Sequence, residues 1–129
     1  MTSPETYIAV VDDEVAVRTM LGRLLRLADY EVTAFACGDD FIRSLATRQP
    51  DCVVLDIHMP GMSGLDVQSH LADAHVALPV VFITASDDVA LDRRVQQAGG
   101  LRLLRKPFSN DELLAAVGSA LHRKGAPLS

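Results

Sequence analysis

The sequence has no tryptophan, only two cysteines and no long apolar run. Neither Cys37 nor Cys52 lies at metal-ligand spacing from another cysteine or a histidine, and two cysteines are too few for a disulfide framework. We therefore expect two ordinary thiols and a reducing, cytoplasmic location. No run approaches the roughly 20 apolar residues of a transmembrane helix. The opening Met-Thr-Ser-Pro-Glu-Thr lacks the charged and apolar segments of a signal peptide, so none is expected.

Positive charge is also scarce. The chain has 12 Lys and Arg against 17 Asp and Glu, which gives a formal net charge of -5. Because nucleic-acid binding depends on basic side chains that neutralise phosphates, this balance predicts that the chain itself does not bind nucleic acid. Its 129 residues fit one domain, and 49% hydrophobic residues are enough for a core.

Apolar runs alternate with segments of helical periodicity along the chain. The expected strands are residues 7–11, 31–35, 52–55, 79–83 and 101–104. The expected helices are residues 15–28, about 41–45, 65–74 and 87–98, the fourth stopped by Gly99-Gly100, and a last helix opened by the capping box Ser109-Asn110-Asp111-Glu112. This order predicts a doubly wound five-stranded parallel α/β domain with five helices over residues 1–122. Residues 123–129 are expected to be a flexible tail or the start of a linker.

Five chemically active side chains follow the ends of these strands. Asp12 and Asp13 follow the first strand, Asp56 the third, Thr84 the fourth and Lys106 the fifth. In an open parallel sheet the carboxyl ends of the strands line one crevice, so these side chains are expected to converge there. Three packed carboxylates repel one another unless a cation lies between them, and oxygen ligands favour Mg²⁺ or a similar hard ion. A lysine facing that cluster supplies a second positive charge, suited to a phosphoryl group.

Four motifs carry a family resemblance: Val-Val-Asp-Asp-Glu at 10–14, Leu-Asp-Ile-His-Met-Pro-Gly-Met-Ser-Gly at 55–64, Ile-Thr-Ala-Ser at 83–86 and Arg-Lys-Pro-Phe at 105–108. In this order and spacing the chain resembles the receiver domain of bacterial two-component response regulators, over about residues 7–121. The resemblance implies a flavodoxin-like fold with strand order 2-1-3-4-5. It also implies a signalling module and not an enzyme, although such a domain takes part in its own phosphoryl transfer and slow dephosphorylation.

The resemblance makes Asp56 the phosphoacceptor, which takes its phosphoryl group from a sensor histidine kinase or a phosphotransfer protein. It implies that Asp13 and Asp56 bind Mg²⁺ (or Mn²⁺) directly, Asp12 through water, and the backbone carbonyl of His58 as a further ligand. The acids after the first strand would also suit the N-terminus of the following helix, and both interpretations can hold together. Glu14 is expected to be a first-turn acid outside the metal shell.

Lys106 and Thr84 are expected to bind phosphoryl oxygens, with help from the Ala85 backbone N–H. The family commonly has a cis peptide between this lysine and Pro107, which proline allows. The side chain of His58 is expected at the rim of the site without a chemical step of its own, although a histidine near a carboxylate would also suit a catalytic base.

One position departs from the family pattern. Three residues before the site lysine, receivers usually carry Tyr, Phe or His, and this ring moves inward when the site threonine shifts. The present chain has Leu103 there. Phosphorylation does not need the ring, but we expect a weaker link between Asp56 and the surface of the fourth helix, or a link through a different movement.

Two other functions stay open from the sequence. A degenerate receiver would bind partners without phosphorylation. A haloacid-dehalogenase-like phosphatase also uses an Asp nucleophile, a metal and a lysine, but it needs a second Asp two residues later, where this chain has His58. In the main hypothesis the chain stands alone or precedes a transcription domain. Its further partners would be an output domain, a downstream protein or a second phosphorylated copy, with no membrane among them.

Overall fold

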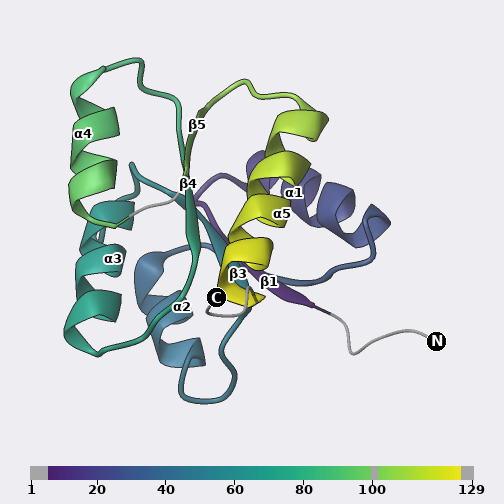
Figure 1. Cartoon of the computed structure of the whole chain (residues 1–129), viewed down its shortest axis with the longest axis horizontal. Coiled ribbons are helices and arrows are strands. Elements are labelled where there is room, and N and C mark those ends of the chain that lie inside the picture. The colour runs from purple at the N-terminus through teal and green to yellow at the C-terminus, as the bar shows by residue number, and fades with distance from the viewer. Residues whose placement is uncertain (1–5, 100–101, 126–129) are drawn as a thin grey trace.

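The computed structural model describes residues 6–99 and 102–125, so residues 126–129 of the expected tail lie outside it (Figure 1). Its sheet has five parallel strands in the order β2-β1-β3-β4-β5. The strands are β1 (Tyr7–Val11), β2 (Glu31–Phe35), β3 (Cys52–Asp56), β4 (Val80–Thr84) and β5 (Arg102–Arg105). The helices are α1 (Val15–Leu27), α2 (Gly38–Ser44), α3 (Gly64–Asp73), α4 (Ala90–Gln97) and α5 (Asn110–Gly125). The predicted fold class and strand order are confirmed.

Helices cover both faces of the sheet. In Figure 1, α1 and α5 lie on one face, and α2, α3 and α4 lie on the other. β1, β3 and β4 are buried along their whole length, which explains why their sequences are continuous apolar runs and not alternating ones. Each face has its own core, with Ile8, Leu21, Leu25 and Leu113 among the buried residues on the α1/α5 side and Phe41, Leu55, Leu71 and Phe82 on the other.

The last helix begins where its sequence signal lies. Ser109 Oγ accepts the Glu112 N–H at 3.0 Å, and the Glu112 carboxylate accepts the Ser109 N–H at 2.8 Å. This confirms the expected capping box. A second capping box, formed by Ser63 and Asp66, opens α3 and was not predicted, because its third helical residue is Asp in place of the usual Glu or Gln.

The fourth helix is shorter than predicted. α4 begins at Ala90, three residues later than expected, because the preceding loop has its own side-chain hydrogen bonds. Ser86 Oγ accepts the Asp88 N–H at 3.1 Å, and Asp88 Oδ1 accepts the Ala90 N–H at 2.9 Å. Such bonds offer the backbone an alternative to helical ones. At the other end Gly99 has a φ of 84°, which fits its expected role as a helix stop, while Gly100 lies outside the described residues.

Two strands are shifted by one residue from their predicted positions. β4 ends at Thr84, and β5 ends at Arg105, each one residue later than expected, while Leu101 lies outside the described residues. The β4 strand begins just after Pro79, because proline has no N–H to donate to the sheet. The Pro79 carbonyl still accepts the Val53 N–H at 3.0 Å. The shift makes Thr84 part of the sheet.

Gly64 allows α3 to begin directly against the end of β3. A Cβ at this residue would lie 2.4 Å from the Asp56 carbonyl oxygen and 2.9 Å from Ile57 Cα. Both atoms belong to the backbone, so a larger residue would displace the strand end that carries Asp56. The Gly64 N–H also donates to the Ile57 carbonyl at 2.8 Å. This close approach fixes the backbone around Asp56.

Neither a membrane span nor a disulfide is found in the part of the chain that the structure describes. None of its helices combines the length and apolar composition needed to cross a bilayer. Cys52 is buried in β3, Cys37 is partly exposed before α2, and no disulfide joins them.

Candidate functional site

Asp12, Asp13 and Asp56 lie together at the carboxyl edge of the sheet. Asp12 and Asp13 follow β1 directly, and Asp56 is the last residue of the neighbouring β3. One carboxylate oxygen from each residue lies within 4.8 Å of the others. Asp12 and Asp56 are buried, 0% and 2% exposed, whereas Asp13 is exposed. This set of oxygen donors fits a hard divalent cation such as Mg²⁺.

The Lys106 ammonium contacts these acids. Its Nζ donates to Asp12 Oδ2 at 3.0 Å and lies 3.7 Å from Asp56 Oδ2. It also donates to Glu14 Oε1 at 3.2 Å. The lysine side chain is 17% exposed, and the Lys106-Pro107 peptide is cis, as the family resemblance implied. The Lys106 ammonium therefore lies between an acid that follows β1 and the acid that ends β3.

Burial and neighbouring charges change the pKa values in this cluster. Burial and the charge of Asp12 raise the pKa of Asp56 from 3.8 to about 6, against the lowering effects of the Lys106 charge and the His58 N–H. Burial acts to lower the pKa of Lys106, but the hydrogen bond to Asp12 and the charges of Asp56 and Asp12 outweigh it and raise that pKa. The lysine is therefore protonated at neutral pH, while Asp56 is a carboxylate that its surroundings disfavour.

Thr84 ends β4, the strand beside Asp56. In the β3–β4 pairing Asp56 lies opposite Ile83, one residue before Thr84. The Thr84 side chain is buried, and its hydroxyl oxygen accepts the Ser86 N–H at 3.1 Å. The Thr84 carbonyl accepts the Lys106 N–H at 2.7 Å, which ties the ends of β4 and β5 together. The sheet therefore brings Thr84 to the same edge as the acids and the lysine.

His58 contributes its backbone to the cluster. Its N–H donates to Asp56 Oδ1 at 3.3 Å, and its side chain is exposed. The imidazole is therefore not among the buried acids. A ligand role for the His58 carbonyl stays a prediction.

Comparison with known proteins identifies the family. The family model described as "Response regulator receiver domain" matches residues 8–118, a range that includes every residue of the cluster described above. The chain belongs to the response regulator receiver family. Two solved structures share the receiver fold. That of response regulator StyR is 39% identical with a TM-score of 0.87, covering 94% of this chain and 61% of that one. FixJ-N, at 24% identity and a TM-score of 0.86, covers 98% of this chain and 99% of that one and supports the fold alone.

Several response regulators contain a region similar to this receiver domain. Nodulation protein W of Bradyrhizobium diazoefficiens is 36% identical over 121 residues, which are 94% of this chain and 53% of that protein. Response regulator protein TmoT of Ectopseudomonas mendocina is 35% identical over 121 residues, 94% of this chain and 55% of that protein. DNA-binding transcriptional regulator NtrC of Salmonella typhimurium is 38% identical over 112 residues, 87% of this chain and 24% of that protein. The chain spans about half the length of the first two relatives.

Two contacts in the receiver site were not predicted from the sequence. Glu14 is the N-cap residue of α1, not a first-turn acid, and its carboxylate contacts Lys106. Arg18 Nη1 donates to the Asp12 carbonyl at 2.8 Å. The Glu14 contact joins residues 92 positions apart, so only the folded sheet brings them together. The Arg18 contact is local, across six positions, and an arginine in the first turn of α1 was a usable signal for it.

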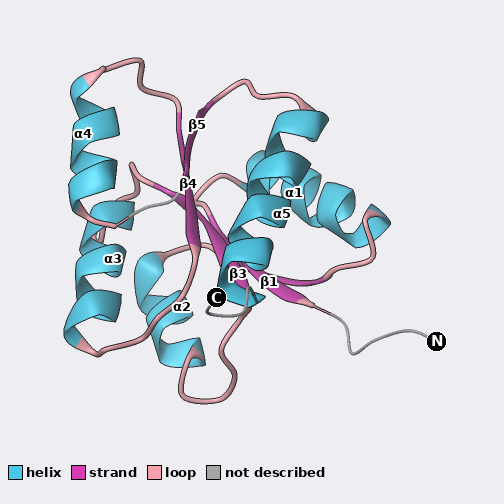
Figure 2. Ribbon diagram, in the orientation of Figure 1, coloured by secondary structure: helices cyan, strands magenta, loops and turns pink. Residues whose placement is uncertain are grey.

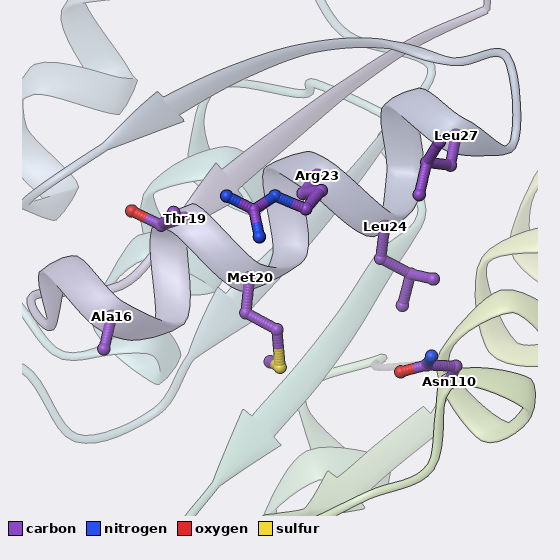
Figure 3. Close-up of a pocket in the computed structure, with 7 residues that line it drawn as sticks. All are labelled: Ala16, Thr19, Met20, Arg23, Leu24, Leu27 and Asn110. Atoms are coloured by element: carbon purple, nitrogen blue, oxygen red, sulfur yellow. The ribbon is translucent and has the colours of Figure 1, made fainter.

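A separate hollow lies along α1 in this receiver domain, as Figure 3 shows. Its volume is about 520 Å³, and it is lined by Ala16, Thr19, Met20, Arg23, Leu24, Leu27 and Asn110. Apart from Asn110 at the start of α5, these residues all belong to α1. Its lining residues include none of the clustered acids and no lysine, so the hollow is separate from the cluster at the sheet edge.

Proposed function

We propose that Asp56 is the phosphoacceptor of this receiver domain and that its phosphorylation requires Mg²⁺. The observation that carries the proposal is a buried Asp56 at a strand end, grouped with Asp12 and Asp13 and with its carboxylate 3.7 Å from Lys106 Nζ. A carboxylate whose pKa is raised to about 6 is disfavoured by its surroundings, and a cation relieves that cost. The family membership supports the same role.

The phosphoryl group would come from a phosphohistidine on a sensor kinase or a phosphotransfer protein. A carboxylate oxygen of Asp56 attacks the phosphorus, and the bond from phosphorus to the imidazole nitrogen breaks. The electron pair stays on the imidazole, which takes up a proton, and the product is an acyl phosphate on Asp56. Phosphoryl transfer depends mainly on positioning and charge stabilisation. The domain itself is consumed in this step, so it acts as a substrate and signal carrier.

Lys106 and Thr84 would bind the incoming phosphoryl group. Lys106 Nζ already lies at the Asp56 carboxylate and would exchange its bonds to Asp12 and Glu14 for one to a phosphoryl oxygen. The Thr84 hydroxyl would donate to a second oxygen, and the Ala85 N–H would assist.

The acids would hold the metal. Asp13 and Asp56 would bind Mg²⁺ (or Mn²⁺) directly, Asp12 through water, and the His58 carbonyl as a further ligand. The bound ion supplies positive charge that offsets repulsion between the carboxylates and the phosphoryl oxygens.

The chain would stand alone or serve as the N-terminal, regulatory part of a longer cytoplasmic transcriptional regulator. It spans about half of its first relatives, and one relative, TdiR of Thauera aromatica, is a transcriptional regulatory protein. Partners would be the kinase, an output domain or downstream protein, and a second phosphorylated copy. A phosphatase of the haloacid-dehalogenase type finds no support, because His58 stands where its second Asp is required.

Incubation with acetyl phosphate and Mg²⁺ is expected to add the mass of one phosphoryl group to the protein. Asp56→Asn is expected to abolish the adduct, because a neutral amide is a poor nucleophile for this transfer. A chelator is expected to have the same effect. Asp73→Asn, which changes an exposed acid at the end of α3, is the matched control and should be phosphorylated like the wild type. Intact-mass spectrometry is the measurement, since the chain has no tryptophan for a fluorescence readout.

An adduct that persists in Asp56→Asn would assign phosphorylation to another residue. An adduct that forms equally well in chelator would remove the metal from the proposal. Loss of the adduct in Asp73→Asn as well would show that the assay reports folding and not the site.

A further inference from the structure

Arg105, the last residue of β5, contacts the neighbouring loop and helix at three residues. Its Nε donates to the Ser86 carbonyl at 3.1 Å, and its Nη2 donates to the Asp88 carbonyl at 2.8 Å. Nη1 and Nη2 also donate to the two carboxylate oxygens of Asp92, in the first turn of α4, both at 3.3 Å. The planar guanidinium suits such a set, because its five N–H groups point in fixed directions.

Strand alternation places this side chain on the α4 side of the sheet. Leu104 belongs to the core on the α1/α5 side, whereas Leu103 packs against the core on the opposite side. Arg105 comes two residues after Leu103 and therefore shares its side. The side chain of Arg105 is 32% exposed and that of Asp92 is 55% exposed, so this ion pair lies in water, whereas the hydrogen bond to the Ser86 carbonyl is partly buried.

The same loop reaches the phosphorylation site through its backbone. Ser86 donates its N–H to the Thr84 hydroxyl oxygen, and its carbonyl accepts from Arg105. Thr84 lies opposite Arg105 in the β4–β5 register, and the next residue, Lys106, donates its N–H to the Thr84 carbonyl. A shift of the Thr84 side chain would therefore disturb Ser86, and with it the carbonyl that Arg105 binds.

α4 has few other anchors. Of its eight residues, two, Leu91 and Val95, are buried. A hydrogen bond of 2.9 Å from Gln68 Nε2 to the Ala98 carbonyl holds the far end of the helix. At the near end, Arg105 joins the helix to β5 through the Asp88 carbonyl and the Asp92 carboxylate. Because elements with few buried apolar contacts open at low free-energy cost, loss of one polar anchor is expected to be measurable here.

We propose that Arg105 is a positioning residue that couples the loop after Thr84, residues 85–89, to α4. A change at the phosphorylated site would then change the position of α4. This inference rests on the proposed function, since a phosphoryl group on Asp56 is what draws in Thr84. In the unphosphorylated structure the Arg105 contacts hold α4 to the loop. A switch needs different contacts in its two states, and the guanidinium supplies contacts that can be exchanged. Without Arg105, the site responds but α4 does not follow.

The first experiment tests the contacts without phosphorylation. Arg105→Met keeps an unbranched stem and removes all the N–H donors. Hydrogen exchange of α4 backbone amides, measured by NMR, is expected to be about 3- to 10-fold faster in this variant than in the wild type. Arg105→Lys, with one ammonium, is expected to fall between them. Arg102→Met, at the exposed start of the same strand, is the matched control and should exchange like the wild type. Equal exchange in Arg105→Met and the wild type would overturn the proposal.

The second experiment tests the coupling. Beryllofluoride with Mg²⁺ mimics the phosphoryl group, and in the wild type it is expected to shift NMR signals of Thr84, Ser86 and α4. In Arg105→Met the shifts at Thr84 and Ser86 are expected to remain, while those in α4 fall by on the order of threefold. An unchanged α4 response in this variant would overturn the coupling. A wild type without any response at Asp56 or Thr84 would instead refute the proposed function, and the exchange comparison would still decide whether Arg105 holds α4.

Discussion

Asp56→Asn is expected to raise the free energy of unfolding of the metal-free protein by about 1–3 kcal/mol at about pH 8. Burial and the charge of Asp12 raise the pKa of this carboxyl from 3.8 to about 6, so the folded state binds the proton more tightly than the unfolded state does. The stability that comes from the raised pKa is present below about pH 4 and is lost as the pH rises through about 6. Above that range the folded protein holds a disfavoured carboxylate, and the neutral Asn removes its charge.

Urea unfolding in chelator measures this effect. The gain in Asp56→Asn is expected to shrink at about pH 4, where the wild-type carboxyl is largely protonated. The amide oxygen of Asn can still accept the His58 N–H that now donates to Asp56 Oδ1. Asp73→Asn, which is exposed, should change little at either pH. A loss of stability in Asp56→Asn at about pH 8 would mean that the attraction of Lys106 outweighs burial at this carboxylate.

Mg²⁺ is expected to stabilise the wild-type protein by about 2–3 kcal/mol when its concentration is about 100 times the Kd. The ion would offset the repulsion among Asp12, Asp13 and Asp56, whose oxygens lie within 4.8 Å of one another. Asp13→Asn is expected to lose most of this gain. Asp13 is the exposed member of the group, so its replacement removes a ligand with little effect on the core.

Thermal unfolding in MgCl₂, compared with NaCl of equal ionic strength, measures the Mg²⁺ effect. Asp39→Asn, an exposed acid at the start of α2, is the matched control and should keep the full gain. If Asp13→Asn gained as much stability from Mg²⁺ as the wild type, the ion would bind somewhere other than the carboxylate group.

The strands were predicted well because burial determines their sequences. β1 and β2 have the predicted bounds, β3, β4 and β5 each end one residue later than predicted, and β4 also begins one residue later. The start of α4 was predicted three residues too early, because Asp88 accepts the Ala90 N–H, a turn preference of Asp that the helix prediction did not use. The carbonyl of Asp88 is also held by Arg105, a contact across 17 positions. The start of α4 therefore depends on hydrogen bonds within the loop, and a long-range contact from Arg105 holds the same loop.

The site also has features that the sequence predicted and features that it did not. The convergence of Asp12, Asp56 and Lys106 followed from their places at strand ends, which a parallel sheet brings to one edge. The contact between Glu14 and Lys106 did not follow, because it depends on where the long lysine side chain points. The contacts of Arg105 with Ser86, Asp88 and Asp92 likewise could not be predicted, because they depend on where the loop and α4 lie in the folded protein.

Leu103 is expected to be a weak link between Asp56 and the surface of α4. It is partly buried and packs against the core on the α2–α4 side. A leucine can keep this apolar contact in either state of a switch, so it offers little differential free energy. The predicted weak coupling through this position stays a prediction, and Arg105 on the same side of β5 offers a polar route.

Locating the phosphate on the chain tests the central claim most directly. Borohydride reduction of the acyl phosphate converts the modified aspartate into homoserine, and peptide mass spectrometry then identifies its position. The account predicts homoserine at position 56 after treatment with acetyl phosphate and Mg²⁺, and none when chelator replaces Mg²⁺. Homoserine at Asp12 or Asp13, or an equal yield at position 56 in chelator, would contradict the proposal that Asp56 is a metal-dependent phosphoacceptor.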